Sequence, residues 1–278
     1  MYKKTFLLLG ALVASCAAAA ARSCGAPEPT EAQIALAKSF YAMEQEARLA
    51  GNYSAAAQTI EINVYFHVLS TSNAVEDGYI SEDTIAQQLD TMNAAFAPSG
   101  ISFVQAGLDY TINTAWASDQ DELEMKQALR KGTYADLNLY FEPIFDYLGY
   151  CYFPDETDGS SDEVFLLDGC TIYSFSVPGG SATNYDLGLT AVHEIGHHLG
   201  LYHTFQGGCV VGDRVDDTPA EASAASGCPE GRDTCAASGV DPIHNYMDYT
   251  YDTCYEEFTQ GQTDRMYTMW NTYRAQFK

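Results

Sequence analysis

One short segment restricts the fold more than any other, the run His193-Glu194-Ile195-Gly196-His197. On a helix, residues four apart share a face, so both imidazoles can bind one metal ion from the same side. The carboxylate of Glu194 can then reach a water molecule on that ion. The segment therefore predicts a helix that begins near Thr190 and carries a metal site. The alternative is a chance match with two hydrogen-bonded surface histidines.

The residues after this helix supply a third candidate ligand, His203. Gly200 allows the helix to end in a sharp turn that returns the imidazole of His203 to the same ion. This extension argues against a chance match. Three neutral histidines leave one coordination position open, as in catalytic rather than structural zinc sites. We expect Glu194 to act as the general base of a hydrolase that needs no nucleophilic Ser or Cys.

The N-terminus has the pattern of a secretory signal peptide over residues 1–20. Lys3 and Lys4 precede the apolar run 6–13, and the small-residue stretch 17–21 follows. A membrane anchor is the alternative, but the run is short for a hydrocarbon layer of about 30 Å. The mature protein is therefore expected to be secreted and extracellular, without a membrane segment.

Export makes disulfides the expected state of the cysteines. Removing Cys16 with the signal leaves seven of the eight, an odd number. A bacterial lipoprotein signal with Cys16 as the lipidated residue is a second interpretation. Cys151 and Cys170 flank a turn-rich hairpin and are expected to pair. The four cysteines that follow His203 allow three pairings: Cys209, Cys228, Cys235 and Cys254.

Cys24 is the seventh cysteine, near the start of the exported chain. A thiolate is a good zinc ligand, and it could occupy the open coordination position. The alternatives are an unpaired terminal thiol or an intermolecular disulfide. Residues 21–58 form a predicted prosegment, largely helical and rich in polar residues and alanine, and 59–278 form the catalytic domain.

The remaining sequence predicts an α+β domain with one sheet. Its 46% hydrophobic and 18% charged residues are typical of a globular protein, and its net charge of −25 argues against a nucleic-acid partner. Strands are expected at 59–68, 101–112 and 137–141, with one or two more in 164–177. Helices are expected at 81–97, 121–130 and 259–275, the last with a capping box of Thr259 and Gln262. Residues 207–253 are too irregular for regular elements.

An acidic cluster lies in this irregular region, made of Asp213, Asp216, Asp217 and Thr218. Carboxylates and carbonyls at this density suit calcium. A solvated acidic loop is the alternative. His67, His198 and His244 are interpreted as structural.

The zinc segment, His193-Glu194-x-x-His197-x-x-Gly200-x-x-His203, resembles the metzincin signature. Asn245-Tyr246-Met247-Asp248-Tyr249 resembles the metzincin Met-turn. The resemblance implies that Met247 forms an apolar floor under the histidines and that the hydroxyl of Tyr249 stabilises the oxyanion. Cys24 loosely resembles the cysteine switch of other metzincin proenzymes. Residues that shape the specificity pocket are expected between Met247 and Phe258.

A narrower resemblance, to the pappalysin family, covers residues 187–265. This family includes ulilysin and secreted fungal metalloproteases. It implies a mixed twisted sheet, a backing helix above the active-site helix, and an irregular C-terminal subdomain. It also favours calcium at the acidic cluster and the disulfides Cys209–Cys235 and Cys228–Cys254. The motifs that carry it are 187–190, 200–205, 216–219 and 258–259.

The predicted function is that of a zinc endopeptidase that acts on polypeptides. A zinc hydrolase of a non-peptide amide or ester is one alternative, against which the Met-turn argues. A non-catalytic zinc-containing binding protein is another, but a structural site has no need of the base Glu194.

Overall fold

The protein is described here by a computed structural model that covers residues 24–50, 59–144, 146–236 and 239–278. The predicted signal peptide, with Cys16, lies outside these residues. Within them, no helix combines the length and the apolar character needed to cross a membrane.

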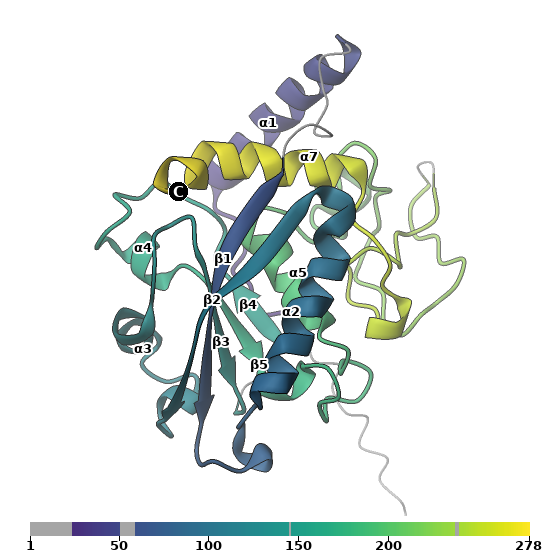
Figure 1. Ribbon diagram of the computed structural model, residues 1–278. Coiled ribbons are helices and arrows are strands. Elements are labelled where there is room, and N and C mark those ends of the chain that lie inside the picture. Colours follow the sequence, from purple (N-terminus) through teal and green to yellow (C-terminus); the bar gives the residue numbers. More distant parts are fainter. Residues whose placement is uncertain (1–23, 51–58, 145, 237–238) are drawn as a thin grey trace, which may run out of the picture.

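The centre of the fold is a five-stranded mixed sheet with the strand order β2-β1-β3-β5-β4 (Figure 1). β1 (Ile60–Ser70) lies parallel to β2 (Ile101–Ile112) and to β3 (Leu137–Glu142). β5 (Cys170–Tyr173) is parallel to β3, whereas the edge strand β4 (Gly149–Cys151) is antiparallel to β5. The mixed sheet and the α+β class are as predicted.

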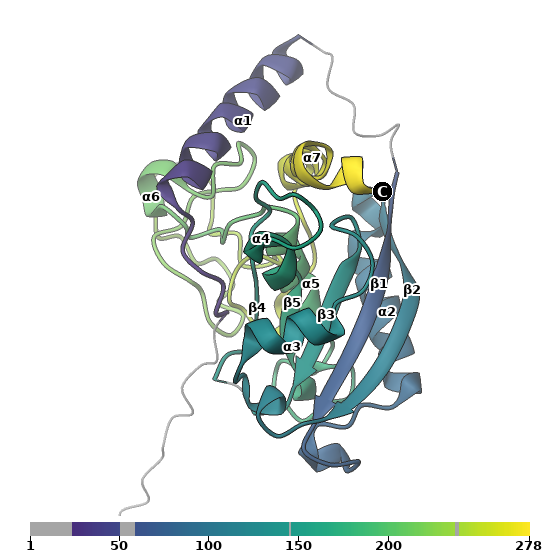
Figure 2. The same cartoon turned by 90° about the vertical axis from the view of Figure 1, so that its left-hand side faces the viewer.

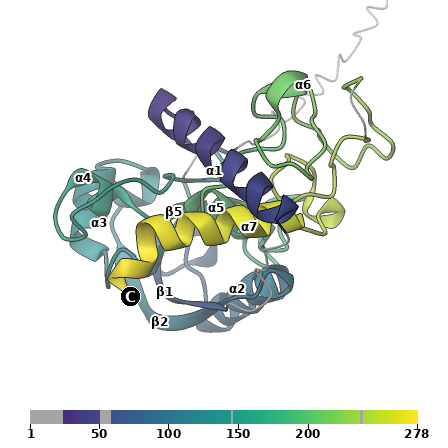
Figure 3. The same cartoon turned by 90° about the horizontal axis from the view of Figure 1, so that it is seen from above.

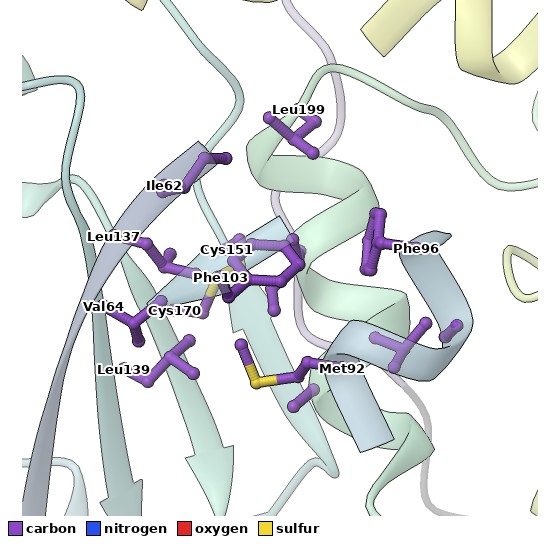
Figure 4. Packing of buried hydrophobic residues seen from close by; sticks show 14 of the residues in the cluster. Ile62, Val64, Met92, Phe96, Phe103, Leu137, Leu139, Cys151, Cys170 and Leu199 are labelled. Atoms are coloured by element: carbon purple, nitrogen blue, oxygen red, sulfur yellow. A yellow bond between two sulfur atoms is a disulfide. The ribbon is translucent and has the colours of Figure 1, made fainter. Parts of the chain in front are cut away.

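Helices cover both faces of the sheet (Figure 2). One face carries α2 (Glu82–Phe96) and α5 (Leu189–His198), and the other carries α3 (Glu122–Leu129) and α4 (Glu163–Leu167). The main core lies between the sheet and the first pair. Figure 4 shows side chains of the sheet facing this pair across the core, where the strands alternate between inward and outward positions. The labelled residues include Val64, Leu137, Leu139, Met92 and Phe96.

The C-terminal part is mostly irregular, as expected, and is held by disulfides. It contains the short helix α6 (Gly208–Val211) and then α7 (Gln260–Met269), which continues as a π-helical turn over Trp270–Arg274. The predicted capping box of Thr259 and Gln262 begins α7. The disulfides agree with the predicted pairings: Cys151–Cys170, Cys209–Cys235 and Cys228–Cys254. Short 3-10 turns occupy Val75–Asp77, Ala97–Ser99, Trp116–Ser118, Ser174–Ser176, Asp252–Cys254 and Ala275–Phe277.

One strand, β5, lies in the stretch 164–177 where one or two were expected, but the first part of the stretch is helical. The segment begins as α4, whose first turn is capped by the Asp162 side chain accepting the Phe165 N–H. Only Cys170–Tyr173 is strand. The predicted hairpin is present, with Cys151 of β4 opposite Cys170 of β5. No range was predicted for β4 itself, because three residues are too few to show an alternating pattern.

The N-terminal segment folds onto the outside of this domain. After Cys24 the chain forms α1 (Glu31–Leu49), the helix expected there. Figures 1 and 3 show α1 lying across α7.

Candidate metal centre

The apolar residues of α5 and its two motif histidines lie on different sides of the helix. Its apolar residues Ala191, Val192 and Ile195 join the main core. His193 and His197 therefore lie together on the remaining face, one turn apart. Both are buried, with exposed fractions of 5% and 0%.

The end of α5 is a Schellman motif built on Gly200. The Gly200 N–H donates to the His197 carbonyl and the Leu201 N–H donates to the Gly196 carbonyl, at 2.8 and 2.9 Å. Gly200 has φ +88°, and a Cβ there would lie 2.5 Å from Cγ of Met269. The sharp turn returns His203 to the metal face, as predicted.

Three imidazole Nε2 atoms converge on one point. The Nε2 atoms of His197 and His203 are 3.0 Å apart. Nδ1 of His193 lies 2.6 Å from the Tyr246 carbonyl, and Nδ1 of His197 lies 2.8 Å from the Leu201 carbonyl. Carbonyls only accept, so each Nδ1 carries the proton and each Nε2 keeps a free lone pair.

These histidines fit a zinc ion. Nε2 of His193 is buried and has no hydrogen-bond partner, as a ligand atom would be without its ion. Burial lowers the pKa of His193 to about 4 and holds the pKa of His197 and His203 well below the usual range. The imidazoles are therefore neutral at physiological pH and able to donate their lone pairs.

Glu194 lies beside this cluster with 1% of its surface exposed. Burial raises the pKa of its carboxyl to about 8, and the hydrogen bond from Cys24 lowers it. A carboxyl group with a pKa near neutrality can both accept and return a proton.

The Met-turn lies under the histidines. Met247 is fully buried, and a side chain at Gly196 of α5 would collide with its Sδ. The Tyr249 ring packs against the metal face, with its centroid 4.9 Å from that of His203. Asn245 accepts the Met247 N–H at 3.0 Å and joins the turn to Gln262 of α7 by two side-chain hydrogen bonds.

Cys24 lies on the open side of the cluster. Its Sγ and the three imidazole nitrogens all lie within 4.8 Å of one another. Gly25 donates its N–H to the carbonyl of Gly149 on β4 at 2.7 Å, so the segment runs along the sheet edge. The Ala26 N–H donates to Sγ at 3.2 Å. Burial and the neighbouring Glu194 raise the pKa of the thiol well above its ordinary value.

A pocket adjoins the metal cluster and is lined there by Cys24, His193 and Glu194. Asp252, a carboxyl group with 2% exposure, also lines it. Oδ2 accepts the Leu187 N–H at 2.8 Å, whereas Oδ1 has no hydrogen-bond partner. Burial raises the pKa of Asp252 to about 7. The other residues of the pocket wall are Leu148, Tyr185, Thr190, Tyr249 and Tyr255.

Sequence reasoning gave a range that contains Asp252 and Tyr255, but it singled out neither. Thr190 was named only as the start of the helix. Gly149 and Tyr185 were missed altogether, and no sequence signal connects them to the zinc motif. They come to the site only through the sheet order and the turn before α5.

The acidic cluster is not gathered around one point. Oδ1 of Asp216 accepts from Tyr41 and Gln45, and Oδ2 of Asp217 accepts the Gly261 N–H. In the part of the chain that the structure describes, the convergent groups of three His, Cys or acidic ligands are the zinc cluster and Cys228, His244 and Cys254, whose cysteines form a disulfide. Asp213 and Thr218 each keep one buried oxygen without a partner. The geometry gives calcium no support, and calcium stays a prediction.

His198 faces away from the metal, as expected, into a buried charge network. Its Nδ1 lies 3.1 Å from Nη2 of Arg274, which donates to Asp168 at 2.8 Å. Arg130 approaches the same carboxylate at 3.3 Å. His67 is likewise structural, held between Asp109 and Asn138; His244 contacts the carbonyl of Cys254.

Comparison with known proteins identifies a family and relatives to which this chain is similar. The family model described as Pregnancy-associated plasma protein-A, Peptidase_M43, matches residues 147–271. An extracellular metalloprotease of Neurospora crassa is 53% identical, covering 99% of both chains. Another, of Colletotrichum graminicola, is 54% identical and covers 98% of both.

Two solved structures of mirolysin are similar to this fold. Mature Tannerella forsythia mirolysin in complex with a cleaved peptide is 28% identical, with a TM-score of 0.64, and covers 77% of this chain and 93% of its own. A promirolysin mutant is 26% identical, with a TM-score of 0.65, and covers 90% of this chain and 94% of its own.

Proposed function

Because this chain belongs to the pappalysin family of zinc metallopeptidases, we propose that it is a secreted endopeptidase made as a latent precursor. The observation that carries the proposal is the convergence of three neutral imidazole nitrogens beside the buried carboxyl of Glu194. The residues that would hold the zinc ion are His193, His197 and His203.

The proposed mechanism assigns the proton transfers to Glu194. Zinc, when bound, supplies a Lewis acid that polarises the scissile carbonyl and lowers the pKa of water to about 7. Glu194 accepts a proton from the attacking water and delivers it to the leaving amine. Tyr249 donates its hydroxyl to the developing oxyanion. Burial keeps the pKa of this phenol well above its ordinary range, so it remains a donor.

Latency is the second part of the proposal. Cys24 occupies the open side of the metal cluster, where substrate and water would bind. The predicted prosegment 21–58 would thus keep the enzyme inactive until the segment leaves. The promirolysin structure covers 90% of this chain, whereas mature mirolysin covers 77%. This difference supports the interpretation of the N-terminal part as a prosegment.

The pocket suggests which polypeptides are cut. A buried carboxyl group with a free oxygen, lining a pocket that also contains three tyrosines, favours a basic side chain, because a cation there gains a charge-assisted hydrogen bond. We therefore propose Lys or Arg in the substrate residue that enters this pocket. The Asp252 carboxyl would ionise as that cation binds.

Secretion is proposed from the signal pattern over 1–20. The printed names of the fungal relatives, extracellular metalloproteases, support it. The strongly acidic chain repels phosphate backbones and therefore favours polypeptide over nucleic-acid partners.

A chelator experiment tests the proposal. Processed protein should digest casein, lose this activity in a zinc chelator, and recover it with zinc but not with calcium. Hydrolysis of amide or ester test compounds without casein cleavage would favour the non-peptide hydrolase. Full zinc occupancy with no hydrolysis of either would favour a binding protein.

A further inference from the structure

The helix α1 covers an apolar groove on the catalytic domain. The walls of this groove come from Phe153, Tyr202, Met269 and Tyr273. α1 inserts Ala37 and Phe40, which keep exposed fractions of 6% and 7%. Gln33, Leu36, Ala37, Phe40 and Glu44 follow one face of the helix, the spacing of an amphipathic helix docked by its apolar side.

An ion pair closes one end of this groove. Nε and Nη2 of Arg265 donate to the two carboxylate oxygens of Glu44 at 2.9 and 3.0 Å. Exposed fractions are 5% for Glu44 and 1% for Arg265. Such a bidentate pair fixes both the position and the rotation of the helix. Tyr41 and Gln45 add hydrogen bonds to Asp216 at 2.9 and 3.0 Å.

The groove adjoins the metal centre without being part of it. Phe153 packs edge-on against Tyr202 in the groove and against His197 on the metal side, with centroid separations of 5.1 and 5.4 Å. Residues 25–30 link Cys24 to the start of α1. The N-terminal segment therefore holds the domain at two places at once.

We propose that this groove is a binding site for the segment 24–49 in its own right, and that it retains the segment after the chain has been cut between α1 and β1. Each anchor raises the effective concentration of the other, so the cut segment stays bound far more tightly than either anchor alone would allow. Cutting the chain does not by itself release activity; the Glu44–Arg265 pair must also open. This inference rests on the proposed latency through Cys24.

Loss of the Glu44 carboxylate should strongly weaken the binding of the segment to the groove. Without Glu44, the Arg265 guanidinium keeps the carbonyl of Arg214, at 3.0 Å, as its hydrogen-bond acceptor among the contacts described here. An unpaired buried charge is costly, so without this carboxylate the segment should bind the groove on the order of 100-fold more weakly.

The experiment uses the full chain with the recognition sequence of an unrelated protease placed within residues 51–58. After cutting, size-exclusion chromatography shows whether the fragment co-elutes with the domain, and a peptide assay reports activity. For the parent we expect co-elution and little activity. Glu44→Gln should release the fragment on the order of 100-fold more readily. Glu46→Gln, the same change on the exposed side of α1, is the matched control and should behave as the parent.

Two further variants separate the anchors. Cys24→Ser should show activity, and its cut fragment should co-elute less completely than that of the parent but not be lost, because the groove anchor remains when the thiol anchor is removed. Phe40→Ala should weaken retention of the fragment because it removes apolar contacts in the groove. If Glu44→Gln fails to fold, Phe40→Ala serves as the test variant in its place. Separation of the parent fragment on cutting alone would overturn the proposal, as would equal retention in Glu44→Gln and Glu46→Gln. A retained fragment with full activity would overturn the latency through Cys24 but leave the groove in place.

Discussion

The thiol of Cys24 donates a hydrogen bond to Oε2 of Glu194 across 3.4 Å. The same sulfur faces the three imidazole nitrogens, so one side chain contacts both the proposed base and the open side of the metal cluster. In the proposed latent form, Cys24 would therefore block the base and the open side of the metal cluster at the same time. A water molecule that replaced the sulfur would meet the same carboxylate.

Replacing this thiol should remove latency. We expect Cys24→Ala to be active before any processing, because nothing then fills the open side of the cluster. Thiol-modifying reagents should activate the parent without a cut. Peptide hydrolysis by the two uncut proteins, compared at equal zinc content, checks this. Equal activity would favour an inert terminal thiol.

The base should be separable from the metal. Glu194→Gln keeps all three histidines, so zinc content should remain near that of the parent. Turnover should fall by about 10²–10⁴-fold, the usual contribution of a general base. Glu124→Gln on the exposed side of α3 is the control for a lost carboxylate. Near-normal turnover in the zinc-loaded variant would rule out the mechanism.

Zinc retention should depend on pH in a defined window. Burial lowers the pKa of His193 from an ordinary 6.5 to about 4, so the folded imidazole stays neutral over that interval. The stability that this neutral group gives the fold is complete above pH 6.5 and is lost as the pH falls through 4. Zinc content after dialysis should therefore hold to mild acidity and collapse near pH 4. Loss centred at pH 6.5 would contradict the buried site.

The pocket carboxylate should set specificity. Asp252→Asn should lower kcat/KM for peptides with Lys or Arg at the pocket by roughly 10- to 100-fold, the worth of a charge-assisted hydrogen bond. Peptides with apolar residues there should be affected little. Asp186→Asn removes a nearby charge that does not line the pocket. Identical profiles for the two variants would reject the assignment.

The glycine that ends α5 should be irreplaceable. Gly200→Ala combines a positive φ with a collision against Met269. Gly179→Ala has φ +75° but open space around its Cβ, so it isolates the backbone strain, about 1 kcal/mol. We expect a larger fall in melting temperature for Gly200→Ala, together with loss of zinc as His203 moves. Equal effects would show that the collision is relieved.

The convergence of His193, His197 and His203 was predictable because they lie within eleven residues of one another, where helix geometry and a single glycine decide their positions. The disulfide pairings followed from the family resemblance and from a local hairpin. Asp252 and Gly149 could not be assigned, since pairing in the sheet and turn contacts bring them to the site. Glu44 and Arg265, separated by 221 residues, carry no pattern in the sequence that links them.

The buried hydrogen-bond network around Arg274 can form only after residue 274 has been synthesised. His198 ends the active-site helix, but its buried cationic partner lies 76 residues further along the chain. That interval contains the third imidazole, the Met-turn and both C-terminal disulfides. A ribosome that has only just released the zinc helix has therefore produced a helix whose inner end is not yet locked. The active-site helix is therefore locked late in synthesis, after residues 24–49, the segment proposed to restrain the site, have been made.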